Sequence, residues 1–213
     1  MSARKPAYAL SRLEGHKGAV NVCRYTYSGD YCMSGGEDRT IMLWNPLKLL
    51  APAAAPPSSS SSGGSGRDAL DSCLLVKSYC GAHGYAINDI SISRDNERFA
   101  SCGGDKTVFV WDITRGEVVR RLNGHTQRVN SVELSAEGGL LLSASYDKSI
   151  LAWDLRSNSR EPVQRMEDFT DSVTKVVHTQ ELAGYIAGSC VDGSVRVYDL
   201  RKGCVHCDKV SYN

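Results

Sequence analysis

Serine, histidine and aspartate side chains recur along this chain at spacings that could build a hydrolytic triad. One set is His83, Ser101 and Asp105. In such a triad the histidine takes the proton of the serine hydroxyl while the aspartate orients the imidazole. The same residue types occur in two further sets: His16, Ser34 and Asp38, then His125, Ser143 and Asp147. An enzyme needs one triad and an oxyanion hole rather than three identical copies, so we predict no catalytic residues. The alternative is an enzyme that uses one of these sets as its catalytic triad.

Two other patterns could hold a metal ion or a nucleotide. Cys204 and Cys207 have the spacing of half a zinc site, but no second cysteine pair lies at a finger-like distance. The glycine pairs at 35–36 and 103–104 are assigned to turns, and the sequence has no Gly-x-x-x-x-Gly-Lys phosphate loop. We therefore expect no metal, no cofactor and no small-molecule substrate.

The three triads belong to a repeated unit, and this repeat determines the predicted architecture. Segments 15–45, 82–112 and 124–154 align without a gap. In each segment 28 positions separate the histidine from a tryptophan, and the aspartate stands six residues before that tryptophan. The tryptophans are Trp44, Trp111 and Trp153. Self-similarity at such a period is the signature of a repeat architecture.

Within each copy the hydrophobic pattern predicts short antiparallel strands. Apolar and polar residues alternate with period two, as half-buried strands require. Turn residues separate a first strand from a second, and a second from a third. A more polar fourth strand is predicted at Cys73–Tyr79, Val118–Leu122, Pro162–Met166 and Val205–Val210. Four antiparallel strands in a unit of about 42 residues form a propeller blade.

The repeats resemble those of the WD40 family, from about Tyr8 to Tyr212 apart from one insert. The resemblance implies an all-β fold, a WD40 β-propeller with about four antiparallel four-stranded blades present. It also implies that the His, Ser, Asp and Trp residues of each strong copy form a buried structural tetrad. The weaker fourth copy has Phe169 near the histidine position and Tyr198 in place of the tryptophan. Its network should be broken, and we expect a less rigid blade.

The whole chain, 1–213, is expected to form a single propeller domain. The predicted blades lie near 15–50 plus 73–80, 83–122, 125–167 and 169–210. Segment 7–13 should supply an outer strand of the kind that closes a WD40 ring. The insert 51–71 is rich in Pro, Ser and Gly, so we predict a disordered loop at the rim, with Ser58–Ser62 as candidate phosphorylation sites.

The number of blades is unusual for this family. WD40 rings usually contain about seven blades, so four blades should leave a gap with two exposed sheet faces. The chain is then a fragment, the product of a truncated gene model, or a half-ring completed by another chain. Tight closure of four blades is the alternative.

Composition excludes several classes of partner. The net charge of +1 gives no bias toward nucleic acid, and no apolar run is long enough for a membrane span or a signal peptide. Most cysteines, among them Cys23, Cys32, Cys102 and Cys190, lie in strand-like segments, where a free thiol acts as a small buried hydrophobe. We expect a reduced, intracellular protein of the cytoplasm and nucleus.

On a propeller, the loops before the first strands and the turns before the third strands open onto the same face. Tyr and Arg are common anchors of protein interfaces. The candidate protein-binding face therefore comprises Lys17, Glu37, Tyr85, Arg128 and Tyr146. For any one of them, an ordinary solvated rim residue is the competing interpretation.

Longer stretches, such as GEVVRRLNGH and VDGSVRVYDLRKG, resemble the mitogen-activated protein kinase organizer family, WD repeat protein 83. The resemblance implies a scaffold for proteins, with spliceosomal or kinase-cascade components as partners. The insert and the missing blades depart from that family. The alternative is a substrate receptor of a cullin-type ubiquitin ligase, because Trp-Asp-Leu-Arg and Tyr-Asp-Leu-Arg endings place Arg156 and Arg201 where such receptors contact the ligase adaptor.

Overall fold

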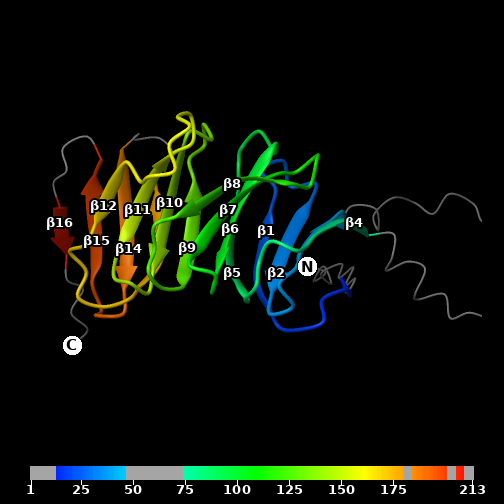
Figure 1. The fold of residues 1–213 in the computed structure, drawn as a ribbon, viewed down its shortest axis with the longest axis horizontal. Coiled ribbons are helices and arrows are strands. Elements are labelled where there is room, and N and C mark those ends of the chain that lie inside the picture. Colours follow the sequence, from blue (N-terminus) through cyan, green and yellow to red (C-terminus); the bar gives the residue numbers. More distant parts are fainter. Residues whose placement is uncertain (1–12, 47–73, 180–183, 201–204, 209–213) are drawn as a thin grey trace, which may run out of the picture.

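The computed structural model describes residues 13–46, 74–179 and 184–200, and the backbone of 205–208. These residues form four antiparallel sheets of four strands, which stand side by side in chain order (Figure 1). Consecutive strands pair within each sheet, and we call the sheets blades 1 to 4. The strands are β1 Val20–Tyr25, β2 Cys32–Gly36, β3 Ile41–Trp44, β4 Leu75–Tyr79, β5 Ile87–Ile92, β6 Arg98–Gly103, β7 Thr107–Asp112, β8 Val118–Asn123, β9 Val129–Leu134, β10 Leu140–Ser145, β11 Ile150–Asp154, β12 Gln164–Met166, β13 Val173–His178, β14 Tyr185–Cys190, β15 Val195–Asp199 and β16 Val205–Asp208.

The first strands of the four blades, β1, β5, β9 and β13, lie next to one another in that order. A repeated asparagine joins each to the next. The side-chain amides of Asn21, Asn88 and Asn130 donate to backbone carbonyl oxygens of the following blade, at 2.9, 2.8 and 2.7 Å. These bonds fix the register of each blade against its neighbour, because a shifted strand would leave a part-buried amide without its acceptor.

A buried carboxylate ties all four blades together. Asp89 of β5 is 4% exposed. It accepts hydrogen bonds from Arg24 of blade 1 at 3.2 Å, Ser131 of blade 3 at 2.8 Å and Lys175 of blade 4 at 2.5 Å. The backbone amide of Val132 donates to it at 3.3 Å. Two cations and two neutral donors offset the cost of removing this charge from water.

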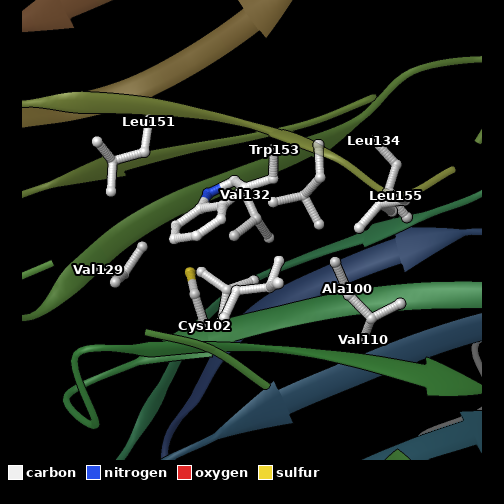
Figure 2. Close-up of a cluster of buried hydrophobic side chains, with 12 residues drawn as sticks. Ala100, Cys102, Val110, Val129, Val132, Leu134, Leu151, Trp153 and Leu155 are labelled. Atoms are coloured by element: carbon white, nitrogen blue, oxygen red, sulfur yellow. The ribbon is translucent and has the colours of Figure 1, made fainter. Parts of the chain in front are cut away.

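The apolar core lies between the blades. One cluster of twelve buried side chains joins blades 2 and 3, and Figure 2 shows Trp153 there among Val129, Val132 and Cys102. A second cluster joins blades 1 and 2, and a third joins blades 3 and 4. Adjacent sheets therefore pack face to face, which is the packing of a propeller.

Blades 1 and 4 lie at opposite ends of the row (Figure 1), so the blades form an unclosed ring. The all-β propeller prediction is confirmed, and the alternative of tight four-blade closure is wrong. At the blade 1 end Val20 and Tyr25 are exposed, and at the blade 4 end Val177 and Val195 are exposed. Both ends present apolar side chains that an interior blade would bury.

Cysteine burial was only partly as predicted. Cys32, Cys102 and Cys190 are buried, but Cys23 is exposed. Cys23 lies on β1 at the free end of the row, where no described element covers it, and its Sγ atom lies 3.1 Å from that of Cys32. The prediction of a buried Cys23 was wrong because strand alternation does not reveal which blade lacks a neighbour.

The predicted strand bounds need small corrections. The fourth strands are shorter than predicted except β8, which extends one residue further to Asn123. Three of the four glycines assigned to turns end strands instead: 35–36 close β2, and Gly103 closes β6, whereas Gly104 lies in the turn as predicted. A Cβ atom on Gly103 would lie 2.1 Å from the carbonyl oxygen of Ala86, so that strand end requires glycine. Segments 7–12 and 51–71, with the predicted closing strand and disordered insert, lie outside the described residues.

The turn between the second and third strands has a residue with positive φ in every blade. Three of these residues carry side chains, Arg39, Lys106 and Lys148, with φ of 63°, 62° and 68°. Blade 4 has Gly193, with φ of 79°. This left-handed conformation costs a residue with a Cβ atom about 1–2 kcal/mol. In each blade the residue immediately before it is the aspartate of the turn.

We predict that Gly193→Ala lowers the free energy of unfolding by about 1 kcal/mol, because alanine pays the left-handed cost. No other atom lies within 4 Å of the new Cβ, so a clash would not contribute. Lys106→Gly, at the matching position of blade 2, should leave stability within about 0.5 kcal/mol, since relief of strain and added unfolded-state entropy oppose each other. Urea unfolding of both variants measures this; equal losses in the two would contradict it.

Candidate functional site

The triad residues of blade 2 form a hydrogen-bonded chain with the tryptophan of β7. His83, in the loop before β5, lies 2.5 Å through Nδ1 from Oδ2 of Asp105 and 2.7 Å through Nε2 from Oγ of Ser101. The indole N–H of Trp111 donates to the same Ser101 oxygen at 2.8 Å. The chain thus connects the entry loop, strands β6 and β7, and the turn between them.

Blades 1 and 3 repeat this arrangement. In blade 1 the three distances, His to Asp, His to Ser and Trp to Ser, are 2.7, 2.7 and 2.8 Å. In blade 3 they are 2.9, 2.8 and 2.9 Å. The twelve residues are His16, Ser34, Asp38, Trp44, His83, Ser101, Asp105, Trp111, His125, Ser143, Asp147 and Trp153. The structure brings every predicted tetrad together.

The direction of the hydrogen bonds in blade 2 follows from what each group can do. The Asp105 carboxylate only accepts, so Nδ1 of His83 carries the proton, and the Trp111 N–H only donates, so the Ser101 oxygen accepts it. The serine hydroxyl then donates to Nε2. Ser101 is 0% exposed. Its oxygen already accepts from an indole and no substrate can reach it, so this chain stabilises the blade and is not arranged for nucleophilic attack.

The electrostatics agree with a buried, structural set. Burial lowers the pKa of His83 below its ordinary 6.5, against the opposing effect of Asp105. Burial would raise the pKa of Asp38, but hydrogen bonds from the Lys17 amide, His16 and Thr40 lower it below its usual 3.8. In blade 3 burial would likewise raise the pKa of Asp147, but hydrogen bonds from His125 and Ser149 hold it well below the usual 3.8.

Blade 4 has a different interior. Phe169 occupies the histidine position, and its ring lies 5.9 Å from that of Tyr198. The serine position is Gly188, where a Cβ atom would come within 2.9 Å of Phe169. Asp192 remains and accepts hydrogen bonds from Thr170 and Ser194, both at 2.5 Å. An apolar ring pair therefore replaces the polar chain. Sequence reasoning missed Gly188, although its place four residues before Asp192 was a readable signal.

The predicted protein-binding residues lie in the expected loops and turns. Arg128 and Tyr146 of blade 3 meet, with the guanidinium carbon 4.8 Å from the centre of the tyrosine ring. They line a hollow of about 570 Å³ with Lys106. Tyr85 of blade 2 is 65% exposed. In blade 1 the carboxylate of the tetrad aspartate accepts from the Lys17 amide, and Glu37 immediately precedes that aspartate in the turn.

The candidate ligase contact is only partly described. Arg156 lies in the loop after β11, exposed, with its guanidinium 2.6 Å from Glu137. Arg201 lies outside the described residues, as do Cys204 and the side chain of Cys207. The part of the chain that the structure describes contains no cluster of three or more His, Cys, Asp or Glu side chains able to bind a metal ion. In that part, no helix has the length and apolarity needed to cross a bilayer.

Comparison with known proteins agrees with the fold. The "WD domain, G-beta repeat" family profile matches residues 8–45, 73–112 and 116–154. This chain therefore belongs to the WD40 repeat family, whose members serve as protein-interaction scaffolds and are generally not enzymes.

Within the family, the chain is homologous to WD repeat domain-containing protein 83. It is 31% identical to the Dictyostelium discoideum homologue, over 90% of this chain and 59% of that protein. It is 39% identical to the protein of Rattus norvegicus, over 96% of this chain and 56% of that one. The chain thus spans somewhat more than half the length of these relatives. The solved structure of U3-55K superposes with a TM-score of 0.75 at 17% identity, covering 92% of this chain and 53% of that one, which supports the fold alone.

We predict that Ser101→Ala lowers the free energy of unfolding by about 1–3 kcal/mol, because Trp111 and His83 each lose a buried partner. Asp105→Ala should have a similar effect. Thermal unfolding of the purified chain measures both. A conservative control is Ser157→Ala, whose hydroxyl makes only local hydrogen bonds, to the Asp154 carbonyl oxygen and from the Ser159 amide, and should matter little. An unchanged melting temperature in Ser101→Ala would contradict the structural role.

Stability should also fall as the pH drops below about 6.5. The pKa of His83 is lowered in the folded state, so the unfolded chain binds more protons there. The stabilisation is complete above 6.5 and is lost as the pH falls through the folded pKa. Urea midpoints between about pH 7.5 and pH 5 should show this slope.

His83→Gln should reduce that slope while lowering stability overall. A residual slope should remain, because burial also lowers the pKa of His178. A slope identical to that of the unaltered chain would show that His83 does not titrate in this range.

Proposed function

We propose that this chain is a non-enzymatic docking scaffold for other proteins, acting in pre-mRNA splicing complexes, in mitogen-activated protein kinase signalling, or in both. The observation that carries the proposal is the exposed pair of Arg128 and Tyr146 over its hollow on the turn face, by which we mean the face that carries the loops before the first strands and the turns before the third. The proposed cellular context comes from the homology to WD repeat domain-containing protein 83. We also propose that the protein acts in the cytoplasm and nucleus.

The pair has the character of an interface anchor. Tyr146 is 44% exposed, and the cation above its ring holds that ring in place before any partner arrives. Its backbone amide bonds the Arg128 carbonyl oxygen at 3.0 Å. Rigid aromatic and guanidinium groups lose little conformational entropy on binding and bury much surface, and loops on a rigid scaffold are common binding sites.

We expect the double variant Arg128→Ala, Tyr146→Ala to lose about tenfold or more in recovery of spliceosomal or kinase-cascade proteins. The tagged full chain would be purified from its own cells and its partners quantified by mass spectrometry. The chain offers a matched control on the opposite face, Arg94 over the ring of Tyr27 at 4.7 Å. Arg94→Ala, Tyr27→Ala should leave recovery unchanged. Equal recovery with both double variants would argue against the turn face.

The ligase-receptor alternative has one supporting observation, the exposed guanidinium of Arg156 in a Trp-Asp-Leu-Arg ending. If it holds, Arg156→Ala should abolish binding of the purified adaptor. Arg115→Ala is the control, since Arg115 is 78% exposed in the same loop of blade 2. Equal binding by the unaltered chain and both variants, or no binding by any of them, would remove this alternative.

A further inference from the structure

The seam between blades 1 and 2 is closed by side chains of β4. Lys77 donates to the carbonyl oxygens of Ile113 and Thr114, in the loop after β7, at 3.3 and 2.7 Å. The hydroxyl of Tyr79 donates to the same Ile113 oxygen at 3.0 Å. The outer strand of one blade is thus pinned to the next blade's loop.

At the seam between blades 2 and 3 the outer strand has the same register but different side chains. In the strand register Arg120 of β8 corresponds to Lys77, since they pair with Val110 and Leu43, each one residue before the blade's tryptophan. Leu122 corresponds to Tyr79 and brings no hydroxyl. Nη1 of Arg120 is buried, and it has no hydrogen-bond partner among the described residues. Lys77 therefore uses its charge to bind the loop of the next blade, whereas its counterpart Arg120 keeps a donor that binds nothing among the described residues.

Two hollows adjoin this guanidinium, of about 630 and 590 Å³. The second runs along all six residues of β8 and faces residues 158–161. Its lining carries three arginines and one acid: Arg120, Arg121, Arg160 and Glu161. The first hollow is lined by three acids, Asp95, Glu97 and Glu137, and by three arginines, so its charges balance. The excess of positive charge lies along the second hollow, beside β8, and favours a ligand with negative charge.

The strand beside the hollow can also accept a chain. β8 is the last strand of its sheet, so its outer edge is not used within blade 2. A row of backbone N–H and C=O groups at a sheet edge can pair with an added extended segment, and side-chain pockets then give specificity. Val119 is 52% exposed on this strand and offers an apolar contact beside the arginines.

We infer that the groove along β8 binds an extended acidic segment of a partner protein, with one of its carboxylates pairing with the guanidinium of Arg120 where that group lines the hollows. This inference rests on the proposed scaffold function and assigns it a second surface. Guanidinium and carboxylate match in geometry and charge, and such bonds are stronger in a partly buried site than in water. In the seam between blades 1 and 2, the loop of blade 2 supplies hydrogen-bond acceptors to Lys77. In the seam between blades 2 and 3, the partner would supply the acceptor to Arg120.

The test uses the full chain and a short fluorescein-labelled peptide that alternates glutamate with valine; its control has glutamine for glutamate. Fluorescence anisotropy should show the acidic peptide binding at least about tenfold more tightly than the control. Arg120→Met should weaken acidic-peptide binding by about tenfold and leave the melting temperature unchanged or raised, because methionine keeps the stem and removes a buried donor without a partner.

Lys77→Met is the matched control at the same strand position. This substitution removes two hydrogen bonds to carbonyl oxygens, so it should lower the melting temperature without weakening the binding of the acidic peptide. No binding by the acidic peptide at millimolar concentration, equal binding by the glutamine peptide, or full binding by Arg120→Met would each overturn the inference. The scaffold proposal is tested separately by Arg128 and Tyr146, so either can fail alone.

Discussion

Each of the first three blades depends on a buried serine hydroxyl. Its oxygen accepts the indole N–H of the third strand, and the hydroxyl of Ser101 donates to an imidazole that is held by the aspartate of the turn. Breaking any one of these hydrogen bonds leaves a buried polar group without its partner, so the entry loop, two β-strands and the turn hold one another in place. That rigidity fixes the positions of the loops on the turn face, where Arg128 and Tyr146 lie.

Fixed spacing made these features predictable. The repeat returns the same residue types at the same offsets, which picks out the twelve tetrad residues and predicts the four-stranded blades. That the twelve residues form buried hydrogen-bonded sets was implied by the resemblance to the WD40 family. The outer strands were less predictable, because their sequences are polar and their ends depend on where the neighbouring blade stops supporting them. Cys23 shows the same limit, since burial at a strand position requires a further blade that the local pattern does not specify.

Residues that occur only once carry the information that the repeat could not. Asp89 stands in an otherwise ordinary strand, and its partners Arg24, Ser131 and Lys175 come from three other blades. An acid within an alternating apolar strand was a signal that a buried charge needed partners, but nothing local identified them. Gly188 and Arg120 are similar, since each is explained by comparison with the matching position of another blade. The strand pairing seen in the structure identifies those matching positions.

The network around Asp89 also means that the blades are not interchangeable copies. Linear repeat arrays can often gain, lose or reorder units, because each unit contacts only its neighbours. Here blade 2 supplies the carboxylate, and blades 1, 3 and 4 each supply a different donor to it. Deleting or exchanging one blade would leave a charge or a donor unmatched at the centre of the remaining ones. Blades with similar sequences therefore have a defined order, because each contributes a different group to one shared network.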